Sequence, residues 1–171
     1  MDDTAAVDGF AATMGGKMLD VVLVNAGVAG PEHRSASAAT AAEIGALMFT
    51  NAIAPVRLAR SLAGHVRPGN GVIAFTSSVM GSVALNTGGH ELYRASKAAL
   101  NSLSRGLWGE LQGRDLTLLS LHPGWVRTDM AGPSAPVSVE DSAAGLVKVI
   151  EDQAGAHKHL FIDYQGNEMA W

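Results

Sequence analysis

Short β-branched runs alternate with longer alanine-rich segments along this chain, and this alternation constrains the fold most. The runs that read as strands span residues 18–24, 71–76, 116–121 and 159–162. The segments with apolar positions at helical spacing span residues 5–14, 40–66, 91–112 and 138–153. Strand–helix alternation predicts parallel strands joined by crossovers, with helices on both faces of one sheet.

Helix starts and chain breaks fit this division. Thr40 with Glu43, and Ser138 with Asp141, have the spacing of a capping box at a helix start. The Pro-Gly-Asn-Gly stretch at 68–71 ends the first long helix. No internal repeat or linker divides the chain, so we expect a single domain over residues 1–171.

Composition excludes several classes of protein. Hydrophobic residues make up 47% and charged residues 16%, which indicates a compact globular chain. The net charge of −4, without a block of like charges, argues against binding to nucleic acid or to an anionic membrane. No cysteine is present, the start is acidic, and the apolar runs are too short to span a bilayer. We therefore expect a cytoplasmic protein.

The first predicted strand poses a problem for this fold. Its Val21–Val24 run is apolar on both faces, which is the pattern of an interior strand in a parallel sheet. Only a short helical segment precedes it, so no earlier strand is available to pair with it. Either the N-terminal part of the domain is missing, or another chain covers this hydrophobic edge.

Tyr93 and Lys97 lie four residues apart on a predicted helix, so their side chains leave the same face. An ammonium beside a phenol favours the phenolate and lowers its pKa, which suits a general acid or base near neutral pH. A Tyr-x-x-x-Lys pair is also an ordinary amphipathic helix pair, and the pair alone does not decide between the two interpretations.

Two polar residues add context to this pair. Ser78 follows a predicted parallel strand at its carboxyl end, where open α/β sheets bind ligands, although serine is also a common turn residue. Asn51 is a poor helix former in the middle of a predicted helix. It could bond the local backbone, face solvent, or hold a water in a proton path to Lys97.

Together these residues resemble the short-chain dehydrogenase/reductase family, over essentially the whole chain. The matching motifs are Asn25-Ala26-Gly27 after the first strand, Asn51 in the next helix, Ser77-Ser78, Tyr93-Arg94-Ala95-Ser96-Lys97, and Pro123-Gly124 with Thr128. The ending at residues 161–171 is similar to the C-factor and carbonyl-reductase-like branch of the family.

The resemblance implies hydride transfer between NAD(P)(H) and a small-molecule carbonyl or alcohol. The residues that discriminate NAD from NADP in the family fall outside this chain, so NADP is taken first only as a guess. The resemblance makes Tyr93 the general acid/base and Lys97 its pKa-lowering partner and ribose ligand. Ser78 would orient the substrate oxygen and Asn51 would support the proton relay. The residues implied to flank the cofactor, beside Tyr93 and Lys97, are Asn25, Ala26, Gly27, Pro123, Gly124, Val126 and Thr128. It also implies a homodimer through the two long helices.

The chain departs from the family pattern at its start. Family members begin with a strand, a Gly-x-x-x-Gly-x-Gly turn and a helix that holds the pyrophosphate, and no such turn occurs here. We therefore expect a partial Rossmann-like, doubly wound parallel sheet that lacks the first βαβαβ half, in an N-terminally truncated member. Asp2 or Asp3 resembles the family's acidic residue near the adenine, although an exposed terminal Asp is the simpler interpretation.

Two functions remain open for such a chain. The first is the family's oxidoreductase activity, with weak or no binding of NAD(P)(H) by the 171-residue chain itself. The second is a non-catalytic truncated remnant that acts as an interaction or signalling protein. A serine hydrolase would need a Gly-x-Ser-x-Gly elbow, which is absent. We expect no metal site, and we interpret His157 and His159 as surface polar residues.

Overall fold

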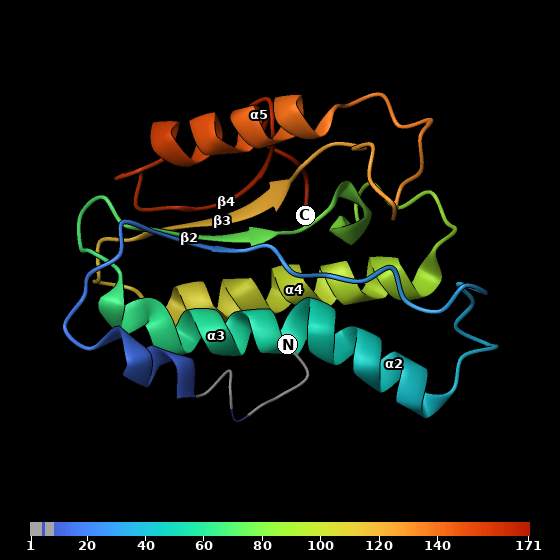
Figure 1. Ribbon diagram of the computed structural model, residues 1–171, viewed down its shortest axis with the longest axis horizontal. Helices are drawn as coiled ribbons and strands as arrows, with labels where there is room; N and C mark the ends of the chain where they lie inside the picture. The colour runs from blue at the N-terminus through green and yellow to red at the C-terminus, as the bar shows by residue number, and fades with distance from the viewer. Residues whose placement is uncertain (1–4, 6–8) are drawn as a thin grey trace.

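Four parallel strands form one sheet in the order in which they occur along the chain (Figure 1). The computed structural model describes residue 5 and residues 9–171. The strands are β1 (Val21–Val24), β2 (Val72–Thr76), β3 (Thr117–His122) and β4 (His159–Asp163). In the register Val22 lies opposite Ile73, and Ile73 lies opposite Leu118. The predicted parallel α/β sheet is confirmed.

Helices cover the two faces of this sheet unequally. On one face lies α5 (Val139–Asp152). On the other lie α4 (Glu91–Glu110) and a long helical run made of α2 (Ala41–Met48), η2 (Phe49–Ile53), α3 (Ala54–Leu62) and η3 (Ala63–His65) (Figure 1). Short 3₁₀ turns, η1 (Ala11–Met14) and η4 (Val79–Gly81), complete the elements. The arrangement is a partial doubly wound fold.

The predicted helix over 40–66 is interrupted by one π-helical turn, η2. Its start agrees with the sequence, because Thr40 and Glu43 form a complete capping box. The Ser138 hydroxyl likewise accepts from the Asp141 backbone N–H at 2.9 Å and starts α5. The predicted first helix at 5–14 falls partly outside the described residues, and its last part is the 3₁₀ turn η1.

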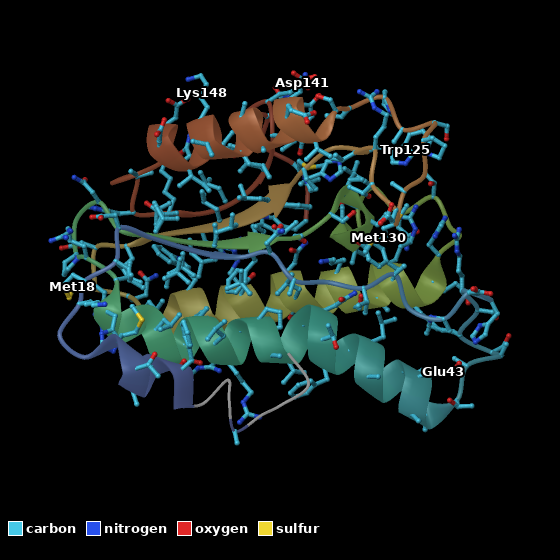
Figure 2. The ribbon with its side chains drawn as sticks, in the orientation of Figure 1. Met18, Glu43, Trp125, Met130, Asp141 and Lys148 are labelled. Atoms are coloured by element: carbon cyan, nitrogen blue, oxygen red, sulfur yellow. The ribbon has the colours of Figure 1, made fainter. Side chains whose placement is uncertain are left out.

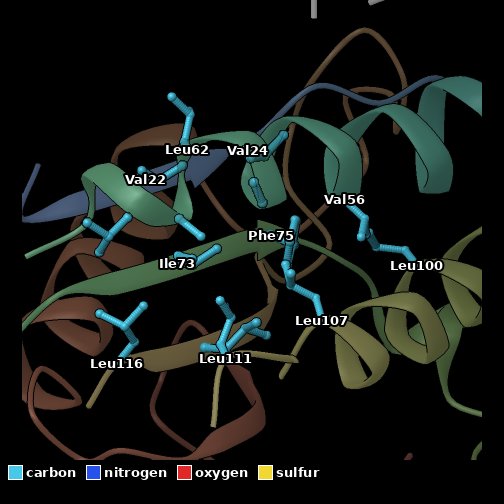
Figure 3. Close-up of a cluster of buried hydrophobic side chains, with 14 of the residues drawn as sticks. Val22, Val24, Val56, Leu62, Ile73, Phe75, Leu100, Leu107, Leu111 and Leu116 are labelled. Atoms are coloured by element: carbon cyan, nitrogen blue, oxygen red, sulfur yellow. The ribbon is translucent and has the colours of Figure 1, made fainter. Parts of the chain in front are cut away.

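The larger core lies between the sheet and the helices α3 and α4. Figure 3 shows β-strand residues such as Val22, Ile73 and Phe75 facing Val56 and Leu107 from these helices. A second apolar cluster packs α5 against the opposite face. The two clusters bury both faces of β2 and β3, which explains the apolar run Val72–Phe75 in β2 and the three leucines of β3.

Strand β1 is an edge of this sheet. Val22 and Val24 are buried under α3, whereas Val21 and Leu23, on the opposite face, are 43% and 44% exposed. The apolar pattern of an interior strand therefore belongs here to a strand with one open face and one free edge. This agrees with the hydrophobic edge expected from the sequence.

The segment after β4 turns back along that strand, which the sequence pattern did not predict. The Asp163 carboxylate accepts hydrogen bonds from the backbone N–H groups of Gln165 and Asn167, both at 2.9 Å, and stabilises the turn. The Met169 N–H then donates to the Phe161 carbonyl at 2.8 Å. The tail therefore runs antiparallel to β4 as far as Trp171.

Candidate active site

The loops that follow the strands bring the predicted residues to one edge of the sheet. Asn25 follows β1 and Ser77 follows β2. The Thr76 hydroxyl donates to the Asn25 side-chain oxygen at 2.6 Å, and the Ser77 N–H donates to the Leu121 carbonyl at 2.7 Å. These bonds tie the ends of three neighbouring strands together, as expected for a ligand-binding edge in an open α/β sheet.

Helix α4 presents Tyr93 and Lys97 toward this edge. Lys97 is only 3% exposed, and its Nζ donates to the Thr76 carbonyl at 2.8 Å. The same Nζ lies 5.7 Å from the centroid of the Tyr93 ring. Burial lowers the pKa of Lys97 to about 8, because desolvation disfavours its charged form.

Ser78 meets Tyr93 across the site. The Ser78 hydroxyl is buried, lies near the Tyr93 phenol, and accepts from the Met80 N–H at 3.1 Å. Burial raises the pKa of Tyr93, and the neighbouring Ser78 hydroxyl offsets only part of this rise. Desolvation of the phenol thus dominates the pKa of Tyr93 in this structure, and a lowering of that pKa by Lys97 stays a prediction.

A close approach between η4 and α4 makes the Ser78–Tyr93 contact possible. A Cβ at Gly81 would lie 2.9 Å from the backbone carbon and oxygen of Lys97, so only glycine fits there. The Ser77 hydroxyl donates to the Asn101 side-chain oxygen at 2.7 Å and joins the same two elements. Sequence reasoning did not single out Gly81 or Asn101.

Asn51 lies in the π-helical turn η2 and is fully buried. Its amide oxygen accepts from the Val28 N–H at 2.8 Å, and its Nδ2 donates to the Val28 carbonyl at 2.8 Å and to the Ser96 hydroxyl at 3.0 Å. The side chain does not face solvent, and the backbone that it bonds is distant in the sequence, so its part in a proton path to Lys97 stays a prediction. Ser96, which donates to the Tyr93 carbonyl at 2.8 Å, links Asn51 to α4.

Gly27 packs directly beside Lys97 and Asn51. A Cβ at this position would lie 3.3 Å from Lys97 Nζ and 3.4 Å from Asn51 Oδ1. The Asn25-Ala26-Gly27 turn therefore joins the Tyr93–Lys97 site, with Asn25 and Ala26 exposed at its rim. A side chain at Gly27 would press on the lysine amine.

The loop after β3 carries the remaining predicted residues and holds itself in place. Gly124 has a φ of 86° and packs against Tyr164, and the Pro123 carbonyl accepts from the Ser142 hydroxyl at 2.7 Å. Val126 bridges to Val137, and Thr128 is exposed. Trp125 and Met130 are also exposed on this loop (Figure 2).

His159 departs from its interpretation as a surface residue. It is 7% exposed, lies near the hydroxyls of Ser104 and Ser120 at 3.4 and 3.5 Å, and packs on Trp171. Burial, with the positive charge of Arg105, lowers its pKa to about 3. His157 is exposed, and its Nε2 lies 2.7 Å from the Gly69 carbonyl.

The described part of the chain contains neither a membrane-spanning helix nor a metal-binding cluster. None of its helices is long and apolar enough to cross a membrane. Within the same residues, no group of three or more His, Cys, Asp or Glu side chains is arranged to hold a metal ion.

Comparison with known proteins identifies the class to which this fold and site belong. Residues 2–137 match the family model for short chain dehydrogenase. The chain belongs to the short-chain dehydrogenase family.

Individual relatives point to two groups within the family. The chain is 38% identical to the C-signal of Myxococcus xanthus, over 90% of this chain and 93% of that protein. It is 47% identical to a carbonyl reductase from Pseudomonas aeruginosa PAO1 solved in complex with NADP, with a TM-score of 0.90, over 99% of this chain and 74% of that one. The carbonyl reductase Sniffer of Drosophila melanogaster is 32% identical, with a TM-score of 0.85, over 99% and 75% of the two chains.

Proposed function

We propose that this chain carries the catalytic part of an NAD(P)-dependent carbonyl reductase. The observation that carries the proposal is the convergence of the Ser78 hydroxyl and the Tyr93 phenol next to the buried amine of Lys97. These three side chains come from two elements and converge where a parallel sheet binds its ligands. The likeness to solved carbonyl reductases supports the same assignment.

In this proposal Tyr93 supplies the proton of the reduction. Its raised pKa keeps the phenol protonated at neutral pH, so it can donate a proton to a carbonyl oxygen. Ser78 hydrogen-bonds the same oxygen and orients it. When bound, a reduced nicotinamide supplies the hydride to the carbonyl carbon, so the carbonyl gains two electrons and two hydrogens and becomes an alcohol.

The residues around Lys97 suit the nicotinamide end of the cofactor. An ammonium has three donors, and the Thr76 carbonyl uses one of them, which leaves donors for the hydroxyls of a ribose. Asn25, Ala26 and Gly27 would flank the adenosine side. Pro123, Gly124, Val126 and Thr128 would line the nicotinamide end, and Asn51 would support the site through Ser96.

The phosphate end of the cofactor has a weaker case. The chain contains no Gly-x-x-x-Gly-x-Gly turn to hold a pyrophosphate at a helix N-terminus. We therefore expect this chain to bind NADP(H) with a dissociation constant weaker than about 100 μM. The NADP found in solved relatives supports NADP over NAD as the cofactor to test first. A homodimer through α2–α3 and α4, and a cytoplasmic location, belong to the same proposal.

Transfer of an isotopic label tests the reaction class. The purified chain is incubated with millimolar NADPH carrying deuterium at both positions of nicotinamide C4, together with a panel of aldehydes and ketones. We expect an alcohol product one mass unit heavier than its unlabelled counterpart, by mass spectrometry. No deuterated alcohol from any carbonyl, with a folded protein by circular dichroism, would reject the reductase proposal.

A second function deserves a test because of one observation on length. The chain spans 93% of the C-signal, a relative of similar length, but 54% to 68% of several longer oxidoreductase relatives. An interaction or signalling role for this chain is the alternative, with the open edge of β1 as its contact surface.

A cellular comparison separates the two functions. Tyr93→Phe removes the proton donor and leaves the surface unchanged, whereas Leu23→Lys changes the open face of β1 and leaves the site unchanged. If the phenotype of a deletion strain is restored by the Leu23→Lys protein only, the reductase function is the relevant one. Restoration by the Tyr93→Phe protein only would favour the interaction function.

A further inference from the structure

The Trp171 side chain packs against residues of β4 and α4. Its ring lies 4.7 Å from the ring centroid of His159 and 5.3 Å from that of Phe161. The guanidinium carbon of Arg105, on α4, lies 4.6 Å from the centroid of the Trp171 ring. Aromatic and cation–π contacts therefore fix this side chain from two elements.

The segment that leads to Trp171 is also well fixed. It leaves β4 through the turn that the Asp163 carboxylate stabilises, and it runs back along the strand. Burial alone would raise the pKa of Asp163, but hydrogen bonds from Asn167 and Gln165 bring that pKa below its ordinary value. The carboxylate therefore stays charged and keeps the turn formed at neutral pH.

The loop at residues 82–90 lies between two elements of the site. It joins η4, which follows Ser78, to α4, which carries Tyr93, and thus connects two neighbouring residues of the site. It contains no regular element, Gly88 and Gly89 have positive φ angles, and Val83 is 74% exposed. Such a segment opens easily unless another part of the chain holds it.

Trp171 forms a hydrogen bond with the middle of this loop. The backbone N–H of Ala84 donates to the Trp171 carbonyl at 3.1 Å. The other hydrogen bonds that the structure describes for residues 83–87 stay within the loop: Leu85 N–H to the Ser82 hydroxyl, Asn86 N–H to the Val83 carbonyl, and Gly88 N–H to the Asn86 side-chain oxygen. The second half of the loop is tied separately, because Arg94 Nε donates to the carbonyls of Gly88 and Gly89.

We propose that Trp171 is a positioning residue, which anchors the loop between Ser78 and Tyr93 and so fixes the loop side of the pocket that this segment lines together with Met80 and Arg94. The ring holds the Trp171 carbonyl in place, the carbonyl holds Ala84, and Ala84 holds the middle of the loop. This role rests on the proposed reductase function for its kinetic consequence. The anchoring of the loop itself does not depend on catalysis.

Hydrogen exchange and steady-state kinetics test the two parts separately. Trp171→Ala removes the ring contacts but keeps the backbone carbonyl, whereas Trp171→Phe keeps a ring against His159 and Phe161. Val147→Ala, on the exposed side of α5, is a surface control. We expect Trp171→Ala to speed amide exchange in the peptide 82–90 by about tenfold or more, with β2 and β3 unchanged. We also expect its KM for the carbonyl substrate to rise about fivefold, with KM for NADPH unchanged. Trp171→Phe should restore most of both.

Each other result decides against part of the proposal. Unchanged exchange in 82–90 would overturn the anchoring, and faster exchange throughout the sheet would reduce Trp171 to a residue of general stability. Faster exchange confined to the loop, with an unchanged KM for the carbonyl, would overturn the positioning role. If the parent chain shows loop protection that depends on Trp171 but reduces no carbonyl, the anchoring stands and the reductase function fails.

Discussion

Lys97 is the residue whose charge the fold perturbs most clearly at the site. Its pKa falls from 10.5 to about 8 because burial disfavours the ammonium. The unfolded chain therefore binds more protons than the folded chain between these two values, and stability rises with pH across this window. Below about pH 8 the folded protein carries the full cost of the buried charge.

A comparison with Lys97→Met measures this cost. Methionine has a similar length and no charge, so the free energy of unfolding of the variant, minus that of the parent, should be larger at pH 7 than at pH 9.5. From the pKa shift, this difference should change by about 2 kcal/mol between the two pH values. Urea unfolding at both pH values gives the free energies. Lys148→Met is the matched control, because Lys148 is exposed and its pKa is raised by Asp152. A difference that does not change with pH would contradict the buried-charge account.

Some residues of the site could be predicted from short sequence motifs, whereas others could be identified only from their packing in the structure. Tyr93, Lys97 and Ser78 stand out from spacing and from the strand they follow, and the structure brings them together. Ser96 and His159 could not be found this way, because their partners are distant in the sequence. The pKa of Tyr93 also depends on burial, which the helix spacing does not report.

The π-helical turn η2, which interrupts the long helix, positions a buried side chain between three elements. A π-helical turn is costly and often marks a functional position. Here it carries Asn51, whose side chain bonds both backbone groups of Val28 and the hydroxyl of Ser96. The turn after β1, the long helix and α4 are thereby joined at one buried amide.

Asn51→Ala should therefore destabilise the whole site. The change removes three hydrogen bonds of a fully buried side chain and leaves the Ser96 hydroxyl without its donor. We expect a loss of about 2 kcal/mol or more in the free energy of unfolding by urea. Ser102→Ala, at an exposed position of α4, should change it by less than about 0.5 kcal/mol. Equal effects of the two variants would contradict the joining role.

The order and type of the elements could be predicted because each has its own periodicity. The capping box of Thr40 and Glu43 marks the start of α2 correctly. The π-helical turn could not be predicted, since its apolar residues continue the spacing of an ordinary helix. The tail along β4 was also missed, because its pairing depends on a turn around Asp163 and not on an apolar run.

At the scale of the whole molecule, the described sheet has one exposed apolar edge strand. Strand β1 has an unpaired edge, and Val21 and Leu23 leave its α5 face apolar and nearly half exposed. Such edges pair with other chains and promote association. The apolar pattern of 21–24 predicted this edge, although it could not show which of the two faces α3 covers.

We expect this edge to cause concentration-dependent association of the purified chain. Leu23→Lys should reduce it, as measured by light scattering over a range of concentrations, with little change in melting temperature because the side chain is already exposed. Val147→Lys adds the same charge on the exposed side of α5, where 55% of the side chain is free, and should have less effect. Equal suppression by both variants would indicate a general effect of charge.

The most direct test of the central claim is the rate of carbonyl reduction by Tyr93→Phe at millimolar NADPH. The chain has two tyrosines, so Tyr164→Phe is a matched control that removes the other phenolic hydroxyl. If Tyr93 donates the proton, its replacement should lower kcat by about a hundredfold to ten-thousandfold, and Tyr164→Phe should leave kcat within about threefold of the parent. A Tyr93→Phe protein that reduces the carbonyl as fast as the parent would contradict the account.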